Sequence, residues 1–308
     1  MDRASTIILV TGATGAQGGA VVHALHAAAR AARALVRNPA SEGARALADA
    51  GIPLAVGDLE DEASLDAAFD GMRALFSVQP APFLDPDSER RQARNLVHAA
   101  RRAGVAQCVH TSVSATGWRT RYPDVDAGSM ANYWDSKEDV EDLVRNAGFD
   151  TFTILKPAFM MDNFIAPKAP IMFPHLSGGE ILTAVQPESV LATVSTSDVA
   201  AAASAAFADP ERFANKEIEL AGDATTIPQI AALISNATER SVVARTLTRD
   251  EVDARQGAAL WLETQLWVNQ VGYLARPDDM RVYGLAPTSF ETWAADNVHQ
   301  LRAATTPV

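Results

Sequence analysis

Short apolar runs and helical segments alternate along the first half of the chain, and this alternation constrains the fold more than any other feature. The apolar runs are rich in β-branched residues, and the segments between them carry apolar residues at helical spacing. Six strands are expected, at Thr6–Thr11, Ala32–Val36, Pro53–Val56, Arg73–Val78, Val105–Val113 and Thr151–Leu155. Five helices are expected between them, at Gly15–Arg30, Ser41–Ala50, Glu62–Phe69, Ser88–Ala103 and Ala131–Ala147. This order predicts an α/β fold with a doubly wound parallel sheet, the Rossmann fold.

The alternation ends at Pro157, which marks the expected boundary between two domains. Ala158–Gly179 holds several prolines and a Gly-Gly pair, so we expect a long irregular segment of the kind that often serves as a lid or binding wall. Helices are expected beyond it at Ser197–Ala208 (with Ser197 as N-cap), Ile227–Asn236, Arg249–Ala275 and Ser289–Ala303, with a short strand at Glu217–Leu220. We therefore expect a Rossmann domain over residues 1–157 and a smaller, mainly helical substrate-binding subdomain over 158–308, with about 189–208 returning to the Rossmann part.

The composition excludes several classes of protein. With 48% hydrophobic and 21% charged residues, the 308-residue chain is too apolar to be disordered throughout. No run approaches the ~18 apolar residues of a membrane span, and a net charge of −12 disfavours nucleic-acid binding. Cys108 has no second cysteine with which to form an internal disulfide, so a cytoplasmic location is expected.

Two further patterns give weaker indications. The histidines and the cysteine lack the spacing of a ligand set, so we expect no metal site. Arg90, Arg91 and Arg94 form a modest basic stripe on one expected helix. This stripe is either solvated or part of a contact between two copies of the chain, which would form a homodimer.

A glycine-rich turn follows the first expected strand and opens the first expected helix. Gly12 permits a tight turn, Gly15 lets the backbone approach a pyrophosphate, and Gly18 lets the helix pack closely on the strand. The helix N-terminus then offers free N–H groups and a positive dipole end to phosphates. This placement predicts dinucleotide binding. The residues expected to contact the cofactor here are Gly12, Thr14, Gly15, Ala16, Gln17 and Gly18.

The end of the second strand bears on the choice of cofactor. Sites for NAD usually carry an acid here, whereas this chain has Arg37, whose guanidinium can bind a 2′-phosphate. NADP(H) is therefore the preferred cofactor, and NAD(H) is the alternative if Arg37 is only a solvated surface arginine. Asp58, at the end of the third strand, could bond the adenine amino group or cap the helix that follows, and both roles are compatible.

A tyrosine and a lysine lie four residues apart on the helix after the fifth strand, so both side chains share one face. The ammonium of Lys137 would lower the pKa of the Tyr133 phenol, which could then act as acid or base for a carbonyl or alcohol oxygen. Lys137 could also bond the nicotinamide ribose, and Ser112 or Ser114 could hold the substrate oxygen. The alternative is a half-buried surface pair, with Lys137 paired to nearby acids.

Six motifs in order, GATGAQGG, LVRNP, GDLED, HTSVSATG, YWDSKEDVEDLVRNAG and LKPAFMMDNF, resemble the NmrA-like branch of the atypical short-chain dehydrogenase/reductases. The resemblance runs from about Ile7 to Phe164 and continues more loosely beyond. It implies an NADP(H)-binding Rossmann domain and a small C-terminal substrate domain. By position it assigns the glycine loop to phosphate, Arg37 to the 2′-phosphate, Asp58 and Leu59 to adenine, Gln79 to the turn after strand four, Lys137 to ribose, and Pro157–Phe159 to the nicotinamide.

Methionines and aromatic residues gather near these motifs and suit a flat, apolar ligand, or else attach the irregular segment to the core. The expected substrate-pocket residues are Trp118, Trp134, Met160, Met161, Phe164 and Trp261.

The combined prediction is an NAD(P)H-dependent oxidoreductase acting on a small, hydrophobic, aromatic or quinonoid carbonyl compound. Tyr133 is its acid/base, Lys137 holds the ribose and tunes the phenol, and Ser112 anchors the oxygen. Because some members of the resembling family are non-catalytic redox sensors, an NADP(H)-binding regulator is an alternative, although sensor-type members tend to lack the tyrosine. A further alternative is a tailoring enzyme that oxygenates or rearranges an aromatic polyketide.

Overall fold

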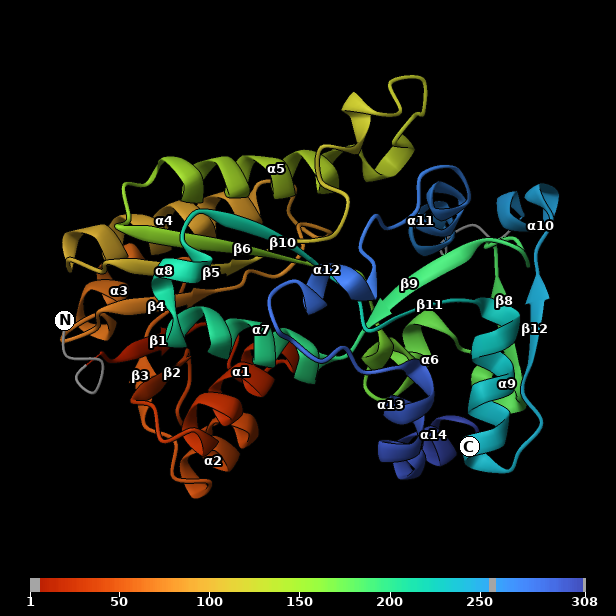
Figure 1. Cartoon of the computed structure of the whole chain (residues 1–308), viewed down its shortest axis with the longest axis horizontal. Coiled ribbons are helices and arrows are strands. Elements are labelled where there is room, and N and C mark those ends of the chain that lie inside the picture. The colour runs from red at the N-terminus through yellow and green to blue at the C-terminus, as the bar shows by residue number, and fades with distance from the viewer. Residues whose placement is uncertain (1–5, 255–258, 307–308) are drawn as a thin grey trace. The chain divides into compact units, whose positions relative to one another are not determined.

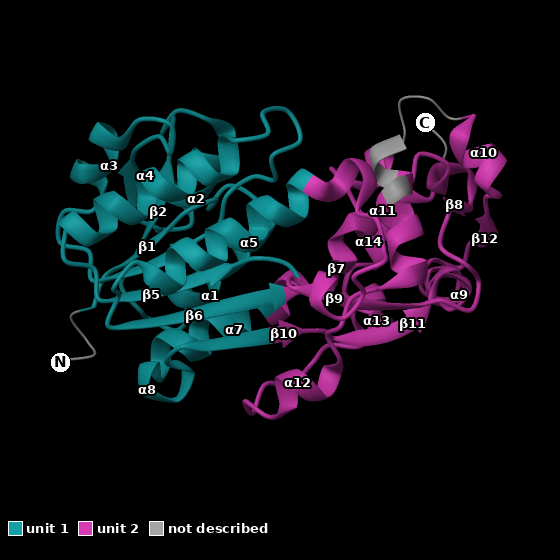
Figure 2. Ribbon diagram, turned by 90° about the horizontal axis from the view of Figure 1, so that it is seen from above, with its two compact units in different colours: residues 1–113, 132–156, 199–218 teal, residues 114–131, 157–198, 219–308 magenta. Residues whose placement is uncertain are grey.

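A computed structural model describes residues 6–254 and 259–306 of the chain. By residue contacts the chain divides into two compact units, shown in two colours in Figure 2. Unit 1 comprises residues 1–113, 132–156 and 199–218, and unit 2 comprises 114–131, 157–198 and 219–308. The segment that returns to the first unit is thus 199–218 rather than about 189–208, because β9 (Val190–Val194) pairs with strands of unit 2.

Unit 1 is built on a seven-stranded sheet in the order β10-β6-β5-β4-β1-β2-β3. The six predicted strands are all present, pair in parallel, and are mostly shorter than their apolar runs. Their bounds are β1 Ile8–Val10, β2 Ala32–Val36, β3 Leu54–Val56, β4 Ala74–Ser77, β5 Gln107–Thr111 and β6 Thr151–Pro157, with β10 Lys216–Leu220 at one edge. Every residue of the central strands β1, β4 and β5 is buried, including the polar residues Gln107, His110 and Thr111 of β5.

Helices cover both faces of this sheet, with α4 and α5 on one face and α1 and α7 on the other (Figure 1). Their bounds are α1 Ala16–Ala27, α2 Glu42–Asp49, α3 Glu62–Ala68, α4 Ser88–Arg102, α5 Ala131–Asn146, α7 Thr196–Ala208 and α8 Pro210–Phe213. Ser41 caps α2 by accepting from the Ala44 N–H. The predicted cap of α7 is wrong by two residues, because Ser195 Oγ accepts from the Asp198 N–H and Ser197 lies inside the helix.

Unit 2 contains more strand than the prediction of a mainly helical subdomain allowed. Strands β7 (Phe159–Met160), β9 and β11 (Asp223–Thr226) form one sheet, and β8 (Glu180–Thr183) and β12 (Val243–Thr246) form another. All have at most five residues, too few to show a periodicity in the sequence. The helices of unit 2 are α6 Ala169–Met172, α9 Ile227–Thr238, α10 Arg249–Asp253, α11 Ala259–Gln270, α12 Pro277–Arg281, α13 Phe290–Asp296 and α14 Val298–Ala304.

Two of the expected C-terminal helices are interrupted. The segment expected at Arg249–Ala275 contains α10 and α11 and ends five residues early at Gln270, shortly before Gly272 with its φ of +69°. The segment expected at Ser289–Ala303 breaks at Asn297, whose backbone is not helical. Among the described residues, no helix combines the length and apolarity needed to cross a membrane.

Candidate cofactor and catalytic site

The glycine turn after β1 has two positions that exclude any side chain. Gly12 has a φ of +60°, and a Cβ there would lie 2.6 Å from Val78 Cγ1. A Cβ on Gly18 would lie 2.3 Å from the carbonyl oxygen of Thr11 and 2.4 Å from that of Gly12. The geometry therefore requires glycine at both positions, one for the turn and one for the close packing of α1 on β1.

Side chains tie this turn to the neighbouring strands. Thr11 Oγ1 donates to the carbonyl oxygen of Val78 and accepts from its N–H, at 3.0 and 2.8 Å. Thr111 Oγ1 donates to Gln17 Oε1 at 2.7 Å, so the Gln17 side chain is bound to the end of β5. The ends of β1, β4 and β5 are thereby fixed relative to one another at the sheet edge where the strand order reverses, which is where doubly wound folds bind ligands.

The N-terminus of α1 is open at this edge. Gly15 is its N-cap and no side chain caps the helix, while Thr14, Gly15 and Ala16 are exposed. Backbone N–H groups of the first turn have no partner within the helix and can bind a phosphate. The turn therefore fits the pyrophosphate of a dinucleotide, as predicted.

The residues expected around the adenosine half lie in unit 1. Arg37, directly after β2, is exposed and has no ion pair within the described ranges, so its guanidinium is available to a 2′-phosphate. Asp58 Oδ1 accepts from the Glu60 N–H at 3.0 Å, which is a turn-stabilising role, and Asp61 rather than Asp58 caps α3. The carbonyl oxygen of Leu59 accepts from Asn95 Nδ2.

Gln79 and Ser112 each carry a buried polar atom without a hydrogen-bond partner in the part of the chain that the structure describes, and both residues lie just beyond the carboxyl ends of strands. Gln79 follows β4; its Nε2 donates to Ser77 Oγ at 3.0 Å, but its Oε1 has no partner. Ser112 follows β5, and its Oγ has no partner. An unpaired buried polar atom costs free energy unless a ligand or water binds it, so both fit the edge of a ligand site. Ser114 does not, because its Oγ accepts from the Ala275 N–H at 3.1 Å.

Tyr133 and Lys137 share one face of α5, as their spacing predicts. Lys137 Nζ lies 5.6 Å from the centroid of the Tyr133 ring. The half-buried Tyr133 ring stacks on Phe83 with centroids 5.8 Å apart and planes within 6°. Trp134 contacts it edge-on at 5.3 Å. The phenol is thus held among aromatic rings.

The prediction that Lys137 lowers the pKa of the phenol is wrong for this structure. Burial raises the pKa of Tyr133 well above its usual value, and the negative charge of Glu89 raises it further. Lys137 has little effect because its ammonium is paired: Nζ lies 2.5 Å from Glu89 Oε1, and both side chains are buried. The alternative of pairing to a nearby acid therefore holds in part, with a buried pair instead of a surface one.

Sequence reasoning missed Glu89 altogether. It lies in the first turn of α4, where an acid is ordinary because it stabilises the helix N-terminus. Nothing in its spacing links it to Lys137, 48 residues later, since the contact depends on how α4 and α5 pack. Phe83 was missed for the same reason, because it lies in the loop between β4 and α4.

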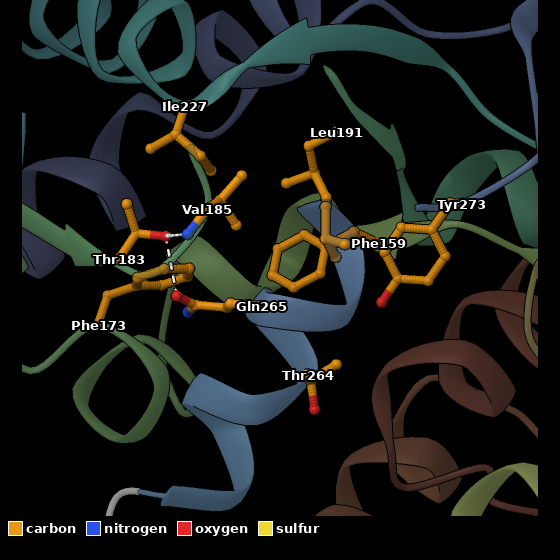
Figure 3. A pocket seen from close by; sticks show the side chains of 10 residues that line it. Phe159, Phe173, Thr183, Val185, Leu191, Ile227, Thr264, Gln265 and Tyr273 are labelled. Atoms are coloured by element: carbon orange, nitrogen blue, oxygen red, sulfur yellow. Dashed lines mark hydrogen bonds between the residues drawn. The ribbon is translucent and has the colours of Figure 1, made fainter. Parts of the chain in front are cut away.

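Unit 2 contains a small apolar pocket, which is partly open to solvent (Figure 3). Rings of Phe159, Phe173 and Tyr273 line it, and Thr183 donates to Gln265 at its wall. Its lining residues are Phe159, Phe173, Thr183, Val185, Leu191, Ile227, Thr264, Gln265, Val268 and Tyr273. Phe159 was expected near the nicotinamide, and in the structure it lines this pocket. Pro157 is the last residue of β6, and its carbonyl oxygen accepts a hydrogen bond from the Ser114 N–H.

The expected substrate residues do not line this pocket. Trp118 and Trp134 are each 1% exposed, and Trp118 packs edge-on against Trp267. Met161 and Phe164 are fully buried, and Phe164 stacks on Phe173 at 4.6 Å. These four therefore pack the interiors of their units, as in the alternative interpretation. Met160 is half-buried in β7, and the side chain of Trp261 lies outside the described part.

Comparison with known proteins identifies the family of the chain. Residues 4–274 match the NmrA-like family. The chain belongs to the NmrA-like family. The resemblance and the Rossmann fold predicted from the sequence are thereby confirmed, since the same fold recurs in solved structures.

Three relatives show how far the similarity extends. Quinone oxidoreductase 2 of Escherichia coli (strain K12) is 29% identical over 251 residues, which cover 80% of each chain. Its crystal structure with NADPH superposes with a TM-score of 0.76 at 25% identity, covering 94% of this chain and 99% of that one. An NAD(P)H azoreductase of Xenophilus azovorans is 29% identical over 275 residues, 88% of each chain. The negative transcriptional regulator NmrA, solved with NADP, shares the fold at a TM-score of 0.75 and 20% identity, over 98% of each chain.

Proposed function

We propose that this NAD(P)-dependent oxidoreductase reduces a small, hydrophobic, aromatic or quinonoid carbonyl compound. The observation that carries the proposal is the Tyr133–Lys137 pair on α5, with the phenol held among aromatic rings. Relatives named quinone oxidoreductase and azoreductase support the substrate class.

NADP(H) is the cofactor, held by the glycine turn, the N-terminus of α1, Arg37 and Lys137. When bound, it supplies the hydride for the carbonyl carbon. Tyr133 gives its phenolic proton to the carbonyl oxygen, since a phenol is protonated at neutral pH. Ser112, whose Oγ has no partner among the described residues, would donate a hydrogen bond to the same oxygen. The product is the alcohol; with a quinone, the resulting hydroxydienone becomes the hydroquinone when the former carbonyl carbon loses its proton and the second carbonyl oxygen takes one up from water.

The test is NADPH oxidation with a panel of benzoquinones and naphthoquinones, for the wild type and Tyr133→Phe. We expect turnover by the wild type, and a loss of kcat of about 10²–10⁴-fold in Tyr133→Phe because the proton donor is gone. The NADPH dissociation constant should be unchanged. Tyr122→Phe, a tyrosine of unit 2, is the matched control and should keep full activity.

Two outcomes would reject the proposal. Full turnover by Tyr133→Phe would remove the phenol from the reaction. Tight NADPH binding without turnover of any quinone or aromatic ketone would favour the redox-sensor function instead.

A further inference from the structure

A buried carboxylate contacts the proposed ribose-binding lysine. Glu89 of α4 is 1% exposed and Lys137 of α5 is 7% exposed. Lys137 Nζ donates to Glu89 Oε1 at 2.5 Å, and Ser136 Oγ donates to Glu89 Oε2 at 2.8 Å. Both carboxylate oxygens are therefore bound within one turn of α5.

Attachment of α4 to α5 does not require this pair. Arg90, the next residue, already joins the two helices through Asp139 at 2.6 Å and Asn132 at 3.0 Å. A buried ion pair is often no more stabilising than apolar residues of the same volume, because both charges lose their hydration. Helix packing alone therefore does not account for a glutamate at position 89.

The ammonium of Lys137 has unused donors. In the described residues Nζ makes one hydrogen bond, the one to Glu89. An ammonium has three N–H groups, so two are left without an acceptor in a buried position. Two free donors suit the paired hydroxyls of a ribose, which the lysine is expected to bind.

We propose that Glu89 is a positioning residue that acts through Lys137, fixing its ammonium in place and keeping it charged so that the two remaining N–H groups bind the ribose of NADP(H). This inference rests on the proposed function for the identity of the ligand. It adds a residue of α4 to the residues that hold the cofactor.

The other groups near Lys137 do not replace Glu89. Tyr133 from α5 is neutral because its pKa is raised, and His110 from β5 is neutral because burial and the charge of Lys137 lower its pKa to about 3. Glu141, one turn further along α5, is paired with Arg145 and Lys156. Glu89 is therefore the carboxylate that fixes the Lys137 ammonium.

The experiment measures the NADPH dissociation constant by fluorescence titration at neutral pH, without substrate. The variants are Glu89→Gln, Lys137→Met and the double variant. Glu89→Gln should weaken NADPH binding by about 10-fold, because the ammonium loses the charged hydrogen bond that fixes it in place. In the Lys137→Met background the Glu89→Gln change should have no further effect on the dissociation constant.

Two further variants separate positioning from folding. Glu141→Gln removes another buried carboxylate of the same unit and should lower the melting temperature without changing the NADPH dissociation constant. Glu89→Asp keeps the charge and should keep part of the affinity, so it serves if Glu89→Gln does not fold. An unchanged dissociation constant in Glu89→Gln, or an equal effect of that change with and without Lys137, would overturn the inference. Because only binding is measured, the outcome does not depend on whether the protein reduces a quinone.

Discussion

At the scale of single residues, Tyr133 and His110 are both held neutral by their surroundings, and each state can be measured. The pKa of Tyr133 is raised by burial and by Glu89, so the phenol keeps its proton above the usual value of 10. Difference titration at the phenolate absorption band, wild type minus Tyr133→Phe, should show a tyrosine that ionises only above about pH 10. Ionisation of Tyr133 below that pH would contradict the assignment of a proton donor surrounded by apolar rings.

His110 should make the free energy of unfolding depend on pH in acid solution. Its folded pKa is about 3 and its unfolded value is 6.5, so below 6.5 the unfolded chain takes up a proton that the folded chain refuses. The free energy of unfolding should therefore fall with acidification by up to about 1.4 kcal/mol per pH unit from this residue alone. Urea unfolding of His110→Gln should show a shallower decline between about pH 6 and pH 4. The exposed His299→Gln is the control and should decline as the wild type does.

Arg37 should decide between the two nicotinamide cofactors. Its exposed guanidinium is free, within the described ranges, to pair with a 2′-phosphate. Arg37→Asp should weaken NADPH binding by about 10- to 100-fold, since a charge-assisted bidentate pair of roughly 1.5–3 kcal/mol is replaced by repulsion. NADH binding should change little, and calorimetric titration with both cofactors gives the ratio. An unchanged ratio would make Arg37 a solvated surface residue.

At the scale of elements, the junction of β1 and α1 is the most tightly constrained. Gly18→Ala places a Cβ against backbone atoms that cannot rotate away, so the helix must shift. We expect the free energy of unfolding to fall by about 1–3 kcal/mol, as for other overpacked sites. NADPH binding should weaken as well, because α1 carries the phosphate site. Gly178→Ala in unit 2, where a Cβ would meet nothing within 4 Å and φ is ordinary, is the control and should be near neutral in urea unfolding.

The sequence predicted well those elements that are specified by residues close together in the chain. Ala32–Val36 is a strand with the predicted bounds, because an apolar run between two polar breaks specifies it. Ser41 starts α2 because its hydroxyl binds the backbone three residues ahead. By contrast, β8 and β12 exist because Glu180–Thr183 and Val243–Thr246 pair with each other, and pairing partners cannot be read from either segment.

The residues of the candidate site fall into the same two groups, those specified by neighbours in the chain and those specified by packing. The glycine turn and the Tyr133–Lys137 spacing follow from neighbouring residues, and the structure has both. Glu89, Phe83 and the paired state of the lysine depend on how helix α4 and its preceding loop pack on α5, which no local pattern encodes. The misassigned tryptophans share one cause: Trp118 and Trp134 occur beside functional motifs, but their size makes full burial more favourable than exposure to a ligand.

At the scale of the whole molecule, unit 1 cannot be obtained by cutting the chain at residue 157. Helix α7 and strand β10 belong to unit 1 and come later in the sequence. Gln107 Nε2 donates to the carbonyl oxygen of Ala206 at 2.8 Å, and Thr153 Oγ1 donates to that of Phe213 at 2.9 Å. A fragment of residues 1–157 should therefore show no cooperative urea transition and should bind a hydrophobic dye, unlike the full chain. A sharp transition in the fragment would show that residues 199–218 are dispensable for the fold.

The single cysteine of the sequence, Cys108, has a practical consequence. It is fully buried in β5, and burial raises the pKa of its thiol, so the reactive thiolate is suppressed. The native chain should thus be inert to maleimides and other thiol reagents. A cysteine introduced at an exposed position such as His299 would be labelled selectively, which allows a spectroscopic probe to be attached in one step without first replacing a native residue.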